Sequence, residues 1–173
     1  MSEHVIDLSR IPEHGSERLN AVVEFLRSLV DYEEGDGISN LKLQKLLYLC
    51  QGWSLAERDA ALFEEDFKAW LHGPVIPAIY QRFKEHGWGP IPPQAPIAVD
   101  PDEHLSEAER ELVEMVWRNY GHMEAKDLEY LTHADKPWLD ARATGTKSPT
   151  IPRESIASCF RAKLDEVADV EEG

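Results

Sequence analysis

Long apolar runs are missing from this sequence. No stretch of its 173 residues approaches the roughly 20 apolar residues that a membrane-spanning helix requires. Residues 1–15 also lack the basic start followed by an apolar stretch that marks a signal peptide. We therefore expect a cytoplasmic protein that does not enter a membrane.

Cysteine is scarce as well. Cys50 and Cys159 are too few for a disulfide framework and do not form a C-x-x-C pair. We expect both to be reduced thiols. Cys50 falls on the apolar stripe of a predicted helix, which favours a small core residue over a nucleophile.

Positive charge is the third deficit, with 18 basic residues against 33 acidic ones and a net charge of −15. Nucleic-acid phosphates repel such a polyanion unless a local basic patch overcomes the field, so direct nucleic-acid binding is not expected. Acidic residues gather within 31–36, 64–66 and 165–172. We interpret these clusters as solvated linkers and helix ends, with attraction of a basic protein partner as the alternative.

Catalytic motifs are also absent. The sequence contains no G-x-S-x-G, P-loop, G-x-G-x-x-G or H-E-x-x-H pattern, and no two of its seven histidines are four residues apart. We predict no enzymatic activity, no cofactor and no metal. The alternative is a metal site assembled from distant residues such as His72, His122 and His133.

Helical periodicity predicts an all-α, single-domain fold of six or seven helices. Ser16, Ser39 and the Ser106–Glu109 capping box mark the starts of three of them. The helix that begins near Ser39 is apolar nearly all round, which is typical of an element buried on more than one face. We expect it to be the centre of the fold. Further helices are expected from Pro77 to Gly87, from Ala125 to His133, around Trp138 and after Pro152.

Two segments do not follow a helical period. Residues 62–75 fit either a short helix or a strand, so one short strand pair is possible, and Gly73-Pro74 breaks this segment. Residues 90–101 hold five prolines, which predicts a semi-rigid connection without regular structure. We divide the chain into an N-terminal arm (1–15), a helical domain (16–164) and an acidic flexible tail (165–173).

Three blocks of the sequence resemble a known family. They are NLKLQKLLYLCQGW (40–53), AWLHGPVIPAIY (69–80) and LTHADKPWLDAR (131–142), and together they are similar to the Panacea domain. That family includes SocA-like antitoxins and phage-associated proteins, and the resemblance extends over roughly residues 18–160. One departure is Leu49-Cys50, where many relatives have an aromatic residue and an alanine.

The resemblance implies a helical domain that binds and neutralises a cognate protein toxin. In the SocA-like branch it further implies an adaptor that delivers the toxin to a Clp-type ATP-dependent protease. Most residues of the three blocks are explained by core packing and chain breaks. His133 and Trp138 are expected to lock a local turn.

Lys45 is harder to explain because it interrupts an otherwise apolar helix. It either snorkels or pairs with a carboxylate, or it is a charged anchor beside Tyr48 on a partner-facing surface. Aromatic residues near chain breaks are core or interface residues, and Trp88 in the turn HGWGP is expected to be exposed. The residues that we predict to bind the partner are Lys42, Lys45, Tyr48, Trp70, His72, Tyr80 and Trp88.

Two other functions stay open at this point. A DNA-binding regulator of its own operon would need a compact basic face. An undetected enzyme would need a concave site that combines His72, His133 or Cys50 with a perturbed pKa.

Overall fold

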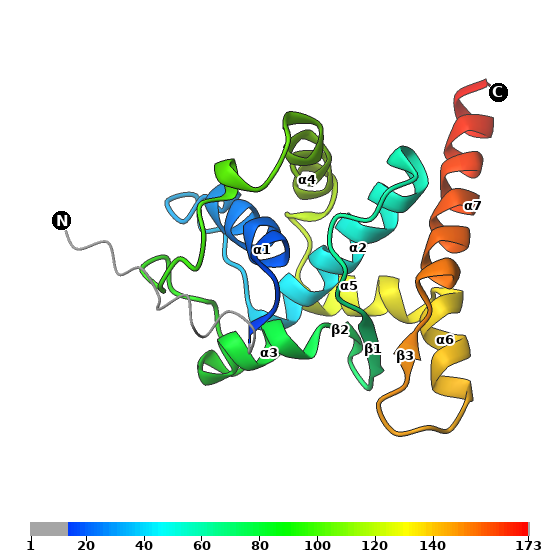
Figure 1. Cartoon of the computed structure of the whole chain (residues 1–173), viewed down its shortest axis with the longest axis horizontal. Helices are drawn as coiled ribbons and strands as arrows, with labels where there is room; N and C mark the ends of the chain where they lie inside the picture. Colours follow the sequence, from blue (N-terminus) through cyan, green and yellow to red (C-terminus); the bar gives the residue numbers. More distant parts are fainter. Residues whose placement is uncertain (1–13, 173) are drawn as a thin grey trace.

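The computed structural model describes residues 14–172. Within this range seven α-helices pack together, and a small sheet lies at one edge of the molecule (Figure 1). The helices are α1 (Glu17–Leu29), α2 (Asn40–Arg58), α3 (Pro77–Phe83), α4 (Glu107–Tyr120), α5 (Ala125–His133), α6 (Lys136–Ala143) and α7 (Arg153–Glu172). The strands are β1 (Phe67–Trp70), β2 (Gly73–Val75) and β3 (Thr150–Ile151), and two 3₁₀ turns are η2 (Lys84–His86) and η3 (Pro101–Glu103). The predicted helical single-domain fold is confirmed.

The helix starts that the sequence predicts are present. The side chains of Ser16, Ser39 and Ser106 each accept a hydrogen bond from the backbone N–H three residues further on. The Glu109 carboxylate accepts a hydrogen bond from the backbone N–H of Ser106, which completes the capping box. These bonds satisfy backbone groups that helices α1, α2 and α4 leave unpaired at their first turns.

Helix α2 is the centre of the fold, as its apolar composition predicts. It lies in the middle of the molecule, with its most extensive contacts to α7, and α1, α3, α4, α5 and β2 cover its other sides (Figure 1). The ring of Phe160 from α7 packs edge-on against Tyr48 and Trp53, with ring centroids 5.5 and 5.3 Å apart. Gly52 makes this close approach possible because a Cβ atom there would lie 2.4 Å from that ring.

The segment that periodicity left open is a β-hairpin. β1 and β2 are antiparallel neighbours, and β3 pairs with the other edge of β1 to give the order β2-β1-β3. The predicted strand pair is therefore present. β3 was not predicted, because two residues are too few to show a period of two.

The proline-rich connection crosses the surface without helix or strand in residues 91–100. The Arg27 guanidinium of α1 donates hydrogen bonds to the carbonyl oxygens of Ala95 and Pro96, at 2.8 and 3.2 Å, and so holds the connection in place.

The predicted arm lies almost wholly outside the described residues. In the predicted tail, α7 continues to Glu172, and the flexibility of this part stays a prediction. Nowhere in 14–172 is there a helix with the length and apolar character needed to cross a bilayer.

Candidate partner-binding surface

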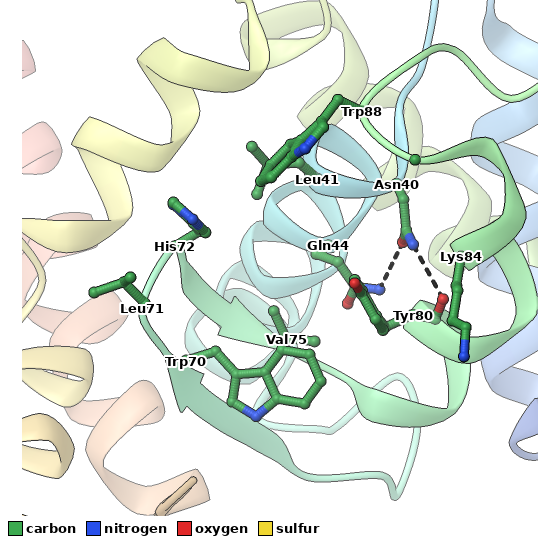
Figure 2. A pocket seen from close by; sticks show the side chains of 11 residues that line it. Asn40, Leu41, Gln44, Trp70, Leu71, His72, Val75, Tyr80, Lys84 and Trp88 are labelled. Carbon is green, nitrogen blue, oxygen red and sulfur yellow. Dashed lines mark hydrogen bonds between the residues drawn. The ribbon is translucent and has the colours of Figure 1, made fainter. Parts of the chain in front are cut away.

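A pocket of about 310 Å³ opens beside the β1–β2 hairpin. Its walls are Trp70, Leu71 and His72 from the hairpin, Tyr80 from α3, and Trp88 from the turn that follows η2. Figure 2 shows Trp88 and Trp70 on opposite sides of the opening, with Tyr80 between them and the start of α2 behind. We call it the aromatic pocket. It brings together four of the seven residues predicted to bind the partner.

Trp70 is held by bonds that reach it from distant parts of the chain. Its Nε1 donates to the Ser148 hydroxyl at 2.8 Å, and its carbonyl oxygen accepts from Trp138 Nε1 at 2.9 Å. Its ring meets that of Tyr80 edge to face, with centroids 5.2 Å apart and planes at 75°. This arrangement is the one that aromatic quadrupoles favour, so the wall is preorganised.

Trp88 forms the opposite wall and is 73% exposed, as its place in a turn predicts. Its ring lies edge to face with His72, with centroids 5.4 Å apart and planes at 90°. Gly87, the residue before it, has a φ of 56°, a conformation that glycine adopts without strain. The turn therefore presents a large aromatic surface to solvent.

The polar side chains behind the pocket form hydrogen bonds with other parts of the chain. Asn40 Nδ2 donates to the carbonyl oxygen of Tyr80 at 3.1 Å, and Gln44 Nε2 donates to Asn40 Oδ1 at 3.2 Å (Figure 2). Gln44 Oε1 accepts from the backbone N–H of Ile76 at 2.8 Å. These amides fix α2 to the start of α3, and they leave the pocket with an apolar character.

Lys45 lies behind the hairpin turn and explains its sequence. Its side chain is fully buried, and Nζ donates to the carbonyl oxygen of Pro74 at 3.0 Å. Gly73 has a φ of 109°, and a Cβ atom there would lie 2.8 Å from Lys45 Cε. Burial lowers the pKa of Lys45 to about 7, and the negative charge of Glu129, which acts to raise this pKa, offsets the effect of burial only in part. Lys45 thus supports the turn that carries the hairpin side of the pocket.

Two predicted histidines meet at one carboxylate. His72 Nδ1 lies 2.8 Å from Glu129 Oε1, and His133 Nε2 lies 3.9 Å from the same oxygen. Burial disfavours ionisation of Glu129, but the His72 hydrogen bond and the charges of Lys126, His72 and His133 hold its pKa below the usual value. Burial lowers the pKa of His133, which stacks on Trp138 at 4.1 Å between centroids.

His122 does not join this pair, because it lines a separate cavity at the start of α2. Across residues 14–172, no three or more His, Cys, Asp or Glu side chains are grouped so that they could hold a metal ion.

Three residues predicted to contact a partner are buried instead. Lys42 is 8% exposed, and Lys45 and Tyr48 are 0% exposed. Lys42 Nζ donates to the carbonyl oxygen of Gly121 at 2.5 Å, and the Tyr48 hydroxyl donates to Asp135 at 3.1 Å. The prediction that Lys45 and Tyr48 lie on a partner-facing surface is wrong for this conformation, because the surrounding helices and β2 cover α2 and leave neither side chain available for direct contact.

Leu71 and Lys84 are among the residues of the aromatic pocket that were not predicted. Leu71 is 66% exposed at its rim, and Lys84 lines it from η2. Leu71 stands next to the predicted Trp70 and His72, so its position beside the Gly73-Pro74 break was a usable signal. Nothing in the sequence around Lys84 distinguishes it from other surface lysines.

Cys50 is fully buried, and burial raises the pKa of its thiol. The thiolate, which is the nucleophilic form, is therefore disfavoured at this position. This environment fits the predicted core role of Cys50.

The chain is similar in sequence to a family of known proteins. The family described as "Antitoxin SocA-like, Panacea domain" matches residues 43–139, which include α2 from Leu43 onward, the hairpin and the walls of the aromatic pocket. The chain is 36% identical to Antitoxin SocA of Caulobacter vibrioides (strain NA1000 / CB15N) over 120 residues. That alignment covers 62% of this chain and 61% of the relative's length. No solved structure matches the chain.

Proposed function

Because this chain belongs to the SocA-like, Panacea-domain antitoxin family, we propose that it neutralises a cognate protein toxin by binding it. The observation that carries the proposal is the family match over residues 43–139, which covers α2 from Leu43 onward and most of the pocket lining. The 36% identity to Antitoxin SocA agrees with it. Neutralisation by stoichiometric association requires no catalytic group on this chain.

The surface that we propose for toxin binding is the aromatic pocket and its rim. Eight large hydrophobic side chains are exposed in the described part of the chain, and three of them, Leu71, Tyr80 and Trp88, belong to this pocket. Clustered exposed apolar groups mark interaction sites, and Trp and Tyr are enriched among residues that dominate binding energy. The net charge of −15 would repel nucleic acid and increase the association rate of a basic protein.

The finer part of the proposal concerns the fate of the bound toxin. We propose that the chain acts in the cytoplasm as an adaptor that presents the toxin to a Clp-type ATP-dependent protease. Its test is the half-life of the toxin in cells with and without the protease. A half-life that shortens only when both the chain and the protease are present supports delivery, and an unchanged half-life contradicts it.

Co-expression with a toxic protein encoded beside this chain tests neutralisation itself. We expect growth to be restored and the two proteins to elute together from a size-exclusion column. A Phe160→Asp variant, which places a charge in the core against Tyr48 and Trp53, is the misfolded control. Continued growth arrest without complex formation by the folded chain would refute the proposal.

A further inference from the structure

We propose that the aromatic pocket binds a partner segment in which a large apolar side chain is followed or preceded by an acidic residue. This inference rests on the proposed function, since the segment belongs to the toxin. It specifies the chemistry of the partner, which the family match leaves open.

The size and lining of the pocket favour an apolar side chain. A volume of about 310 Å³ lies at the low end of the range for ligand pockets, roughly 300–1,000 Å³. Such a volume suits one or two protein side chains better than a large cofactor. The rings of Trp70, Tyr80 and Trp88 in the lining offer stacking and edge contacts to an inserted ring.

The charge of the lining favours an acidic residue next to this apolar side chain in the partner segment. The chain has 33 acidic residues, yet none of the described residues that line the pocket is acidic. The charged residue of its lining is Lys84, which is exposed. Among residues 14–172, neither the ammonium group of Lys84 nor the indole N–H of Trp88 has a hydrogen-bond acceptor. These donors suit a carboxylate on the partner.

A cation is the competing occupant, because aromatic rings also bind lysine and arginine side chains. A carboxylate close to the rings would strengthen the binding of a cation. Glu129, the carboxylate that pairs with His72 of the lining, is only 9% exposed and is already shared by His72, Lys126 and His133. The positive charge of Lys84 in the lining would disfavour a cation. The lining therefore favours the acidic segment.

The test uses two blocked tetrapeptides, glycine-tryptophan-glutamate-glycine and glycine-tryptophan-lysine-glycine, titrated into the full chain. Binding is followed by the indole N–H signals of Trp70 and Trp88 in nitrogen-15 NMR spectra, assigned with single Trp→Phe variants. We expect both signals to shift with the glutamate peptide, at an affinity about threefold higher than with the lysine peptide, as an exposed charge contact allows. Equal affinity, or a preference for the lysine peptide, would overturn the proposal.

Two variants make the test specific. Lys84→Glu should abolish the preference for the glutamate peptide, whereas Lys136→Glu, at an 80% exposed side chain away from the pocket, should leave it unchanged. Trp88→Ala should weaken binding of both peptides about tenfold. Because the Trp88 side chain is 73% exposed, this variant should fold, and its circular dichroism spectrum checks that it does.

Growth rescue separates this inference from the proposed function. If the Trp88→Ala/Lys84→Glu double variant neutralises the toxin as well as the unaltered chain does, the pocket assignment is wrong and the antitoxin function stands. If the unaltered chain binds the glutamate peptide but does not rescue growth, the antitoxin function is wrong and the binding preference of the pocket stands.

Discussion

Replacement of Lys45 by methionine should change the dependence of stability on pH. The side chain is fully buried, its pKa is about 7, and the unfolded chain has an ordinary lysine pKa near 10.5. Between these values the unfolded chain binds more protons than the folded one, so stability rises with pH. Below pH 7 both states are protonated and the burial penalty is fully present; it is relieved as pH rises toward 10.5.

The magnitude follows from the difference of the two pKa values. A shift of about 3.5 units corresponds to roughly 5 kcal/mol of folding free energy, at about 1.36 kcal/mol per unit. Lys45→Met removes this penalty but leaves the carbonyl oxygen of Pro74 without its donor, which costs about 1–3 kcal/mol. The variant should therefore be about 2–4 kcal/mol more stable than the unaltered chain at pH 6. At pH 10.5 only the lost hydrogen bond counts, and the variant should be less stable.

Urea denaturation followed by tryptophan fluorescence, at pH steps from 6 to 10.5, measures this crossover. Burial also raises the pKa of Tyr48 and Cys50, which lowers stability at high pH. Because both groups are present in both proteins, their effects on stability cancel when the two proteins are compared. Lys136→Met, at an exposed side chain, is the control and should follow the unaltered profile. Parallel profiles for Lys45→Met and the unaltered chain would show that Lys45 stays charged at no cost, and the reasoning would fail.

Two further predictions concern the core. Gly52→Ala should destabilise the chain by about 1–3 kcal/mol in urea denaturation, because the new methyl group would meet the Phe160 ring. Helix propensity alone predicts a gain of stability, and such a gain would contradict this prediction. Iodoacetamide should alkylate Cys159 well before Cys50 in the folded chain, since Cys50 is fully enclosed and Cys159 is only partly buried, and mass spectrometry of the digested protein reveals the order.

Features set by neighbouring residues were predictable from the sequence. The caps at Ser16, Ser39 and Ser106 depend on backbone groups three residues away, so a short pattern is enough to indicate them. The burial of α2 follows from apolar residues on nearly every face. The strand β3 depends on pairing with β1, about 80 residues earlier, and no local pattern reports such pairing.

The candidate site was predictable only in part for the same reason. Trp70, His72, Tyr80 and Trp88 are aromatic residues beside chain breaks, and this local signal indicated them as interface residues. The acceptor of Lys45 lies 29 residues away and that of Tyr48 lies 87 residues away. Both polar groups find partners only in the folded chain, so their sequence positions could not distinguish a buried structural role from an exposed one.

The dependence of α2 on α7 has a consequence for synthesis of this protein. Helix α2 is apolar on nearly every face, and the Phe160 ring that covers Tyr48 and Trp53 is translated roughly 100 residues later. At about 5–20 residues per second, the ribosome needs on the order of 5–20 s to produce it. During that interval the nascent chain exposes an uncovered hydrophobic helix, which is the kind of segment that chaperones bind. Production of the folded domain therefore lags behind translation of its central helix.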